Sequence, residues 1–434
     1  MSEESGVRKL NVYVNDALVG VLKDIGNIWS FEYDDNWVSN KQAFSLCPDI
    51  PLEMGEQIDG STTRPIQHFF DNLLPEENAR KLLAKDLDIK DQTDTFLLLQ
   101  KSGKESAGAL TLLPEGVGIP DRQVESLTGE QISERIANLP KAPLNNKEHK
   151  RMSLAGAQHK MLVVVQKGQF YEPNIAMPST HILKPDHSEP NDYWQTTMNE
   201  WFIMTLADKV GLDVPNVLIR YTPEPVYVIE RFDRLGKYPD HLRLHIIDAC
   251  QLLGLSKSSK YSSSNSEIYN KFISKARPRA VVVTRVYQWV LFNLLIGNAD
   301  AHLKNVSFYQ TANGAQLAPF YDLLSTLIYE KRNSNILREP LSIPIGTKTT
   351  FEDVTFYDLS LFASSIGLPV KVMKKVTLDM CNDIQVNFDV LYLLVSKQPP
   401  RIELPGELRM LREINYKVLQ PILSKITCSM SQLS

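Results

Sequence analysis

Three polar side chains in the second half of the chain have the types and the spacing that phosphoryl transfer from a nucleotide requires. Asp300 is followed five residues later by Asn305, and Asp322 comes after a short intervening segment. In such a set one carboxylate orients and deprotonates the attacking hydroxyl, while the amide and the second carboxylate hold magnesium on the phosphates. Magnesium suits these ligands because it is a hard cation that takes oxygen donors and keeps positions for phosphate oxygens and water. The pattern makes Asp300 the candidate base, and Asn305 and Asp322 the candidate metal ligands.

The residues before this set decide between catalysis and an ordinary loop. Asp, His and Asn also make the backbone hydrogen bonds of turns and caps, so residues 296–305 alone fit a helix end that runs into a polar turn equally well. Apolar residues at helical spacing come before Gly297, however, and predict a buried helix that ends there: Val282, Val286, Trp289, Val290 and Leu294. A polar cluster at the end of a buried helix is a better platform for chemistry than a surface loop, which favours the catalytic interpretation.

A lysine in an apolar strand and a glutamate on the next helix form a second part of a nucleotide site. Lys184 lies late in the strand expected at 180–185, and Glu200 lies beside the apolar stripe of a helix expected from about 192 to 210. A lysine in such a strand is most often a solvated edge residue. With a glutamate on the following helix, it matches the ion pair by which protein kinases fix a lysine on the α- and β-phosphates. The sequence therefore predicts that Lys184 pairs with Glu200.

Two further segments fit a nucleotide site less specifically. Small residues at 153–160 precede a strand, and small residues let a backbone bring its amides close to a phosphate. This run contains only Gly156, whereas a kinase glycine loop has three glycines, so an ordinary turn explains it better on its own. The apolar strand at 226–230 ends in charged residues where a kinase chain crosses between its lobes, and backbone groups there can pair with adenine. The alternative for Asp233 and Arg234 is a surface ion pair worth little.

The rest of the chain predicts an α+β organisation around these motifs. Residues 8–33 alternate apolar and polar positions as a small antiparallel sheet does, a helix follows Pro75, and a strand ends near Pro114. Residues 115–150 are rich in Pro, Gly, Asn and Lys, which is typical of a linker. Helical patterns dominate from 248 onward. We expect three units: an N-terminal α+β unit with its linker (1–146), a unit with the phosphate loop, strand lysine and hinge (147–236), and a helical unit with the catalytic and metal-binding loops (237–434).

Composition and charge describe an ordinary globular protein. The 434 residues are 43% hydrophobic and 23% charged, and the formal net charge of -4 gives no global reason to expect nucleic acid, although a local basic patch would not show in it. The four cysteines are widely spaced and form no Cys-x-x-Cys pair, which argues against a disulfide framework and a zinc site. No apolar run approaches the length of a membrane span, so we expect a cytoplasmic protein without membrane contact. The serine-rich residues 256–266 are expected to form a flexible surface loop.

Taken in order, these motifs are the parts of a kinase in kinase order, and the sequence resembles the HipA family, the serine/threonine kinase toxins of bacterial HipBA toxin–antitoxin modules. The similarity covers essentially the whole chain. It rests on residues 69–75, 108–111, 153–158, 230–234, 300–305 and 319–322. Several such motifs in the right order are far more specific than any one of them.

The resemblance implies a two-lobed, protein-kinase-like fold that uses ATP and Mg²⁺. It makes Asp300 the catalytic base, Asn305 and Asp322 the magnesium ligands, and Ser153 an autophosphorylation site whose modification expels the phosphate loop and inactivates the kinase. It gives nucleotide contacts to Lys184, with Glu200 as its supporting partner. The other residues that we assign to the nucleotide are Ala155, Gly156, Ala157, Gln158, His159, Lys160, Glu230, Arg231, Phe232, His302, Lys304 and Tyr321.

The resemblance also implies partners. It predicts a HipB-like helix-turn-helix antitoxin and a protein substrate of the aminoacyl-tRNA synthetase class, glutamyl in the best-known case. The segment that matches a lysine-rich, DNA-contacting loop of some relatives, residues 345–350, has a single lysine here, so operator DNA is expected to be contacted mainly through the antitoxin. Two alternatives remain open: a kinase-shaped corepressor that bridges an antitoxin on operator DNA, and a small-molecule or lipid kinase.

Overall fold

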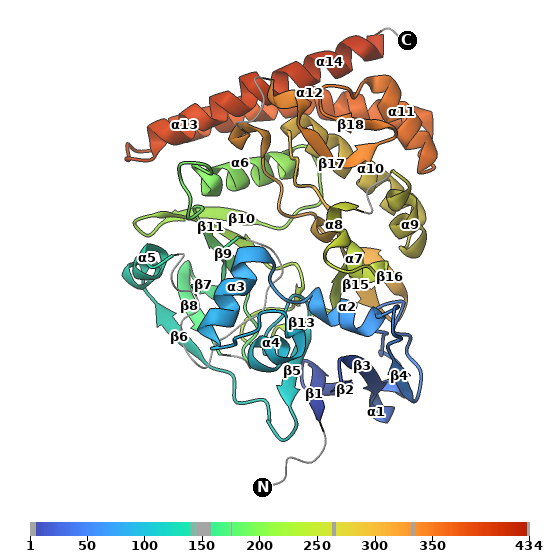
Figure 1. Ribbon diagram of the computed structural model, residues 1–434. Helices are drawn as coiled ribbons and strands as arrows, with labels where there is room; N and C mark the ends of the chain where they lie inside the picture. Colours follow the sequence, from blue (N-terminus) through green and yellow to red (C-terminus); the bar gives the residue numbers. More distant parts are fainter. Residues whose placement is uncertain are drawn as a thin grey trace.

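The computed structural model is built from two large antiparallel sheets, three small ones and a helical region (Figure 1). One sheet lies at the N-terminal end of the molecule, the second lies in the middle, and long helices cover the opposite end, where the C-terminus is found. The structure describes residues 6–139, 144, 158–174, 176–262, 266–330 and 335–431.

The N-terminal sheet confirms the strands expected from alternating apolar residues. Its order is β4-β3-β2-β1-β5, and all its pairings are antiparallel. Asn15, with a positive φ of 52°, makes the turn between the first two strands. The strands are β1 (Val7–Val14), β2 (Ala17–Ile25), β3 (Ile28–Tyr33), β4 (Glu56–Ile58) and β5 (Leu110–Pro114), and the helices are α1 (Asp35–Val38), α2 (Pro65–Asp71), α3 (Glu77–Asp86) and α4 (Thr95–Ser102).

The second sheet has six strands in the order β10-β11-β9-β7-β8-β6. It includes β6 (Val124–Leu127), β7 (Met161–Gln166), β8 (Gln169–Pro173), β9 (His181–Pro185), β10 (Val217–Tyr221) and β11 (Pro225–Glu230), with helices α5 (Gly129–Ala137) and α6 (Thr196–Lys209). The expectation of a linker at 115–150 needs correction here. Strand β6 pairs with β8, and Leu127 and Ile132 are buried in the core of this sheet. Residues 124–137 therefore belong to the second sheet, because they carry enough apolar side chains to pack against it.

Helices dominate the remainder, as expected. They are α7 (Ala249–Leu252), α8 (Ser259–Ser262), α9 (Glu267–Lys275), α10 (Arg279–Ile296), α11 (Phe356–Ser365), α12 (Val370–Ser396), α13 (Leu404–Glu413), a π-helix (Ile414–Leu419) and α14 (Gln420–Ser431). Short strands join them: β12 (Arg234–Leu235), β13 (Leu242–Arg243), β14 (Ile246–Asp248), β15 (Ser307–Thr311), β16 (Gly314–Leu317), β17 (Pro340–Ile345) and β18 (Lys348–Thr350). The four cysteines are free thiols.

Helix α10 is the central helix of this region, and its end is the point from which the candidate site is built. Gly297 ends the helix in the left-handed conformation, at φ 66°. A Cβ atom there would lie 2.5 Å from Val418 Cγ1 and 2.9 Å from Leu327 Cδ1, so only glycine fits. Sequence length and hydropathy would allow α10 to cross a membrane, contrary to the expectation above. However, 67% of it is buried inside the protein, which is what a core helix shows.

Candidate active site

Two loops meet at the end of α10 and carry the candidate catalytic residues. The Thr326 N–H donates a hydrogen bond to the Gly297 carbonyl at 3.0 Å. In the other direction, the Ala299 N–H donates to the Thr326 hydroxyl oxygen at 2.7 Å. These bonds tie the loop that contains Asp300 to the loop that follows Asp322. Asp300 and Asp322 are therefore fixed on neighbouring loops although 21 residues separate them in the sequence.

The Asp300 carboxylate is open to solvent and has two polar neighbours. Its side chain is 54% exposed, and its Oδ1 lies 3.9 Å from His302 Nε2. The hydroxyl of Tyr261 donates a hydrogen bond to the same oxygen. The Asp300 N–H donates to Asn298 Oδ1 at 3.0 Å, which orients the turn. An exposed carboxylate on a fixed turn is what a general base for an incoming hydroxyl needs. Tyr261 was missed because it lies in a serine-rich segment that we expected to be a flexible loop.

The two candidate metal ligands are both held in place. Asn305 ends the 3-10 helix Leu303–Asn305 (η1) and donates its side-chain N–H to the Asp300 carbonyl at 2.9 Å, which leaves its amide oxygen as an acceptor. Asp322 has a φ of 55°, in the left-handed region that few residues other than glycine adopt. Such strain is retained mainly where function requires it. The Asp322 side chain is 34% exposed, so its carboxylate can be reached from solvent.

The predicted ion pair between Lys184 and Glu200 is present. Lys184 Nζ lies 2.7 Å from Glu200 Oε1, and it also donates to the Asp322 carboxylate. Burial raises the pKa of Glu200 to about 7 against the attraction of Lys184. Burial would raise the pKa of Asp322 as well, but Lys184 and Lys160 outweigh it and hold this pKa at about 2. Asp322 is therefore ionised at neutral pH.

Helix α6 also fixes the loop that carries Asp322. The Asn199 side chain is fully buried, accepts a hydrogen bond from the Ser325 N–H at 2.9 Å and donates to the Ser325 carbonyl at 2.8 Å. Because Glu200 is the next residue on the same helix, α6 positions both Lys184 and the segment after Asp322. The sequence did not single out Asn199, since a polar residue next to an apolar stripe gives no sign of its partner.

The end of the predicted phosphate loop reaches this site. Gln158, His159 and Lys160 lead into β7 and are partly buried. Burial and repulsion from Lys184 lower the pKa of Lys160 to about 8, opposed by the attraction of Asp322. Because its surroundings disfavour the charged form of Lys160, an anionic ligand beside it would stabilise that charge. The other residues predicted in this loop, Ser153, Ala155, Gly156 and Ala157, lie outside the described residues.

The side chains of the predicted hinge, residues 230–232, have partners within the protein. The guanidinium of Arg231 is buried and donates to both carboxylate oxygens of Asp233, at 2.9 and 2.7 Å. The guanidinium also donates to the Ser179 hydroxyl at 3.1 Å and to the Ser106 carbonyl at 3.3 Å. Its donors are therefore used inside the protein, which argues against the nucleotide contact expected for the Arg231 side chain. Phe232 stacks on Tyr321 with ring centroids 5.6 Å apart. Glu230 accepts a hydrogen bond from Asn216 Nδ2 at 2.7 Å.

Lys304 has a different role from the one expected. Its buried ammonium donates to Asp248 Oδ2 at 2.8 Å and to the Asn72 Oδ1 and carbonyl oxygens at 2.8 and 3.1 Å. An ammonium has three N–H donors, so these bonds leave none for a phosphate. Glu76 Oε1 lies 3.6 Å from the same nitrogen. Lys304 thus ties the loop after Asp300 to the N-terminal region, over more than 220 residues of sequence.

Two family models match the chain. The HipA N-terminal domain matches residues 10–113, and the HipA-like C-terminal domain matches residues 152–388, which is more than half of the sequence. The chain belongs to the HipA family. The resemblance stated from the motifs is therefore confirmed.

Individual HipA relatives agree with this assignment over most of their length. The chain is 31% identical to a serine/threonine-protein kinase toxin HipA of Shewanella oneidensis, over 83% of this chain and 84% of that one. It is 34% identical to a protein of Sinorhizobium fredii named putative kinase Y4mE, over 86% and 89%. A solved complex of Shewanella oneidensis HipA, HipB and operator DNA matches with a TM-score of 0.81 and 27% identity, covering 98% of this chain. The HipA-like α+β fold that we expected is thus confirmed.

In this HipA-family chain the hinge is joined to the N-terminal region by a buried cluster of charges. Arg231 and Arg234 each pair with both Asp233 and Glu105, and the same two carboxylates act on the buried guanidinium of Arg243. Glu105 is fully buried and accepts hydrogen bonds from the Ser179 N–H and hydroxyl at 3.1 and 2.9 Å. The cluster overturns the alternative of a weak surface ion pair at Asp233 and Arg234. Sequence reasoning missed Glu105, because its arginine partners lie more than 120 residues away and Ser179 lies 74 residues away.

Replacing Glu105 with glutamine is expected to lower the free energy of unfolding by roughly 3–5 kcal/mol, the usual cost of breaking a buried ion pair. The change removes the negative charge of Glu105 from a buried site where Arg231, Arg234 and Arg243 act on it. Urea denaturation, followed by circular dichroism, measures the loss. Glu130→Gln is the matched control, since Glu130 is exposed on α5 and its loss should stay within about 0.5 kcal/mol. Equal midpoints for both variants would contradict the structural role of Glu105.

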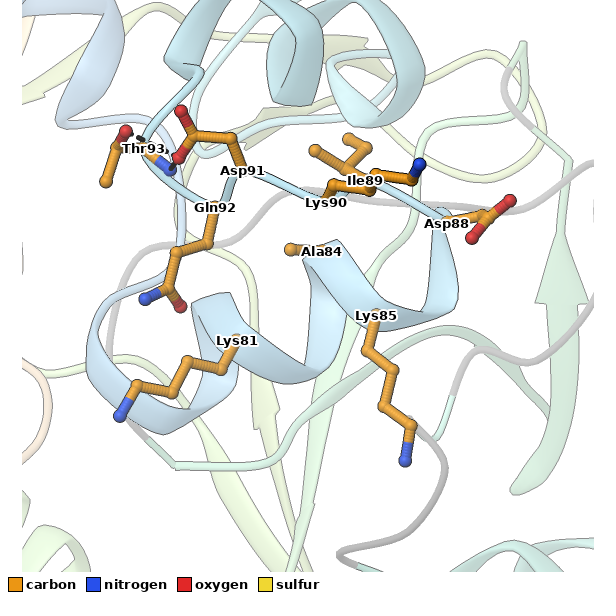
Figure 2. A pocket seen from close by; sticks show the side chains of 9 residues that line it. All are labelled: Lys81, Ala84, Lys85, Asp88, Ile89, Lys90, Asp91, Gln92 and Thr93. Atoms are coloured by element: carbon orange, nitrogen blue, oxygen red, sulfur yellow. Dashed lines mark hydrogen bonds between the residues drawn. The ribbon is translucent and has the colours of Figure 1, made fainter.

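A surface hollow between α3 and the segment after it is separate from this site (Figure 2). It measures about 490 Å³ and is lined by Lys81, Ala84, Lys85, Asp88, Ile89, Lys90, Asp91, Gln92 and Thr93. Its charged side chains are exposed, and both signs are present. None of its residues belongs to the loops around Asp300, so it carries no role in the chemistry described above.

Proposed function

We propose that this chain is an ATP- and magnesium-dependent serine/threonine protein kinase and the toxin of a type II toxin–antitoxin module. The observation that carries the proposal is the position of Lys184, which joins Glu200 on α6 to Asp322 on the loop tied to Asp300. A lysine with a strand–helix ion pair, a loop carboxylate and a nearby open aspartate is the constellation of phosphoryl transfer. The name of the Shewanella oneidensis relative supports the same activity.

The donor set fits a magnesium ion and a polyphosphate. Among the described residues no three His, Cys, Asp or Glu side chains converge on a point, so a metal here would take Asp322, Asn305 and oxygens of the nucleotide and water. The low pKa of Asp322, held at about 2 by Lys184 and Lys160 against burial, keeps this ligand charged. When bound, magnesium would neutralise charge on the phosphates. Lys184 and Lys160 supply the remaining positive charge for the same phosphates.

The chain's own residues divide the reaction between them. Asp300 accepts the proton of the substrate hydroxyl while that oxygen attacks the γ-phosphorus and the bond to ADP breaks. Lys184, held by Glu200, orients the α- and β-phosphates. The backbone of residues 230–232 and the ring of Phe232, stacked on Tyr321, provide the surface for adenine. His302 lies beside the base, where it can orient the carboxylate rather than bind the nucleotide.

The partners are proposed from the relative whose solved complex contains HipB and operator DNA. A HipB-like helix-turn-helix antitoxin would neutralise this chain and hold it on DNA. The β17–β18 hairpin carries a single lysine at its end, Lys348, whose ammonium lies 3.9 Å from Asp358. A single partly paired lysine contributes little phosphate affinity, so DNA contact through the antitoxin is favoured. For the substrate we propose an aminoacyl-tRNA synthetase, such as the glutamyl enzyme.

Phosphorylation of Ser153 is expected to reduce ATP affinity by roughly 5- to 150-fold, the usual range of coupling between two sites. A phosphate adds a charge of about -1.5 to -2 near the anionic nucleotide and can pair with Lys160 instead. Mass spectrometry after incubation with ATP identifies the modification, and calorimetry compares the two forms. Ser153→Ala is the control, which should bind ATP normally after the same incubation. An undiminished ATP affinity in the phosphorylated form would contradict the proposed inactivation by phosphorylation of Ser153.

The proposed activity is tested by incubating the purified chain with labelled ATP, magnesium and a cell extract. Label on this chain and on a specific extract protein is the expected result. Tight magnesium-dependent ATP binding with no transfer to any protein would favour the corepressor instead. Transfer of label only to a lipid or to a small molecule would show that the chain is a lipid or small-molecule kinase instead.

A further inference from the structure

A segment of the chain's own sequence lies across the candidate base. The hydroxyl of Tyr261, on the one-turn helix α8, donates a hydrogen bond to Asp300 Oδ1. Its ring meets His302 edge to face, with centroids 5.1 Å apart. A substrate hydroxyl must donate to this same carboxylate before transfer. Tyr261 therefore presents a hydroxyl of this chain at the group that an acceptor hydroxyl would use.

The segment is held there by two lysines that contact carboxylates of the N-terminal region. Lys260 Nζ lies 2.6 Å from Glu76 Oε2 and 3.7 Å from Glu77 Oε1. Lys257 Nζ lies 2.9 Å from Asp71 Oδ2. Residues 257–261 were expected to belong to a flexible surface loop, but they are docked on the N-terminal region. The docking surface presents carboxylates to the lysines of the segment, although it also carries Arg80, which lies 2.8 Å from Asp71.

Glu76 places this acidic surface beside the chemistry. Its Oε1 lies 3.6 Å from the ammonium of Lys304, which is the residue before Asn305 in η1. One carboxylate thus contacts both the lysine that precedes Tyr261 and the loop that follows Asp300. The burial differs along the segment: the Lys260 side chain is 11% exposed, whereas the Tyr261 residue is 43% exposed. The lysine is the anchored end, and the hydroxyl end is open to exchange.

We propose that residues 257–261 occupy the acceptor site as a pseudosubstrate, and that this site binds substrate segments in which a lysine or arginine directly precedes the hydroxyl residue. The inference rests on the proposed kinase function and adds a substrate class and a form of autoinhibition to it. Glu76 and Glu77 recognise the basic residue, and Asp300 receives the hydroxyl. An arginine suits the same carboxylates, because its fork of N–H donors pairs with them in two places.

The first test removes only the competing hydroxyl. Tyr261→Phe keeps the ring against His302, and it should raise kcat/KM for a peptide acceptor about tenfold, the equivalent of one hydrogen bond to a charged group. The KM for ATP should not change. Tyr357→Phe is the control, since Tyr357 is 55% exposed on α11 and away from Asp300. A gain in activity is a readout that a misfolded variant cannot give.

The second test examines recognition of the basic residue on the peptide, where folding is not at issue. The probe is a peptide of residues 254–262 with Tyr261→Ser and its other serines replaced by alanine. The same peptide with Lys260→Gln should be phosphorylated with a kcat/KM lower by about tenfold, because the charge that Glu76 and Glu77 recognise is lost.

The outcomes separate this inference from the kinase function beneath it. The wild-type chain is assayed in parallel for transfer of label to itself and to a cell extract. One outcome is that the wild-type chain transfers label to itself or to the extract, while Tyr261→Phe shows unchanged or lower activity on the peptide. This outcome contradicts the pseudosubstrate proposal but leaves the kinase function standing. Equal activity on the two peptides overturns the substrate class. No transfer to any acceptor overturns the kinase function and the inference together.

Discussion

Replacing Asp300 with asparagine is expected to slow phosphoryl transfer by roughly a hundred- to ten-thousandfold, the usual contribution of a positioned general base. Asparagine has the same shape and can still accept the hydrogen bond from Tyr261, but it cannot take up a proton. The turn itself is held by the Asp300 N–H, which donates to Asn298 and does not involve the carboxylate. The fold and most of the ATP affinity should therefore survive. Labelled ATP measures the rate, and calorimetry measures the affinity.

The matched control for this prediction is Asp379→Asn. Asp379 is a half-exposed carboxylate on α12 that pairs with Lys375 four residues away, so the same chemical change there should leave the rate unaltered. A thermal denaturation midpoint within a few degrees of wild type shows that the Asp300 variant is folded. Autophosphorylation at the wild-type rate in that folded variant would show that Asp300 is not the base.

The sequence predicted those parts of the site whose partners are close in the chain. Asn305 follows Asp300 by five residues, and Glu200 follows Lys184 by sixteen, on the helix after the strand. Strand and helix periodicity are enough to bring such residues together, since consecutive elements usually pack side by side. The ion pair of Lys184 and the buried helix before Asp300 could therefore be predicted without any coordinates.

The parts that were missed depend on contacts between distant segments. Lys304 was assigned to the nucleotide from its place beside Asn305, yet its ammonium is used by Asn72, 232 residues away, and by Asp248. A lysine in sequence gives no sign of which carboxylate or carbonyl will surround it. Tyr261 was missed because its serine-rich neighbours suggested flexibility. The carboxylates that hold its segment belong to α2, to α3 and to the residues between them, far away in the sequence.

In the fold, as in the site, features set by local sequence were predicted and features set by contacts between distant segments were missed. Alternation of apolar residues predicted β1 to β3, and Gly297 marked the end of α10 correctly. The helical region expected from 248 onward is interrupted before this helix, since α9 ends at Lys275 and α10 starts at Arg279, after Pro278. Proline has no N–H to donate and disfavours helical geometry in the residue before it, so the apolar spacing continued while the helix did not. The membership of β6 in the second sheet followed from pairing with β8, which composition could not show.

Replacing Asp322 with asparagine is expected to abolish most of the gain in ATP affinity that magnesium provides, by about a hundredfold or more for loss of a charged ligand. Lys184 and Lys160 hold the pKa of Asp322 at about 2 against burial, so its carboxylate offers the metal a charged oxygen at neutral pH. Asparagine offers only a neutral amide oxygen, so the attraction between a full negative charge and the divalent cation is lost.

Titration calorimetry with ATP in magnesium and in EDTA separates the two carboxylates. The Asp322 variant should bind ATP in EDTA at least as tightly as wild type, because one negative charge near the phosphates has been removed. It should gain little on addition of magnesium, whereas the Asp300 variant should keep the full gain. Equal losses of magnesium-dependent affinity in both variants would contradict separate roles for the two residues. If only the Asp322 variant loses the gain from magnesium, Asp322 binds the metal and Asp300 acts on the hydroxyl, although hydrogen bonds hold their loops together.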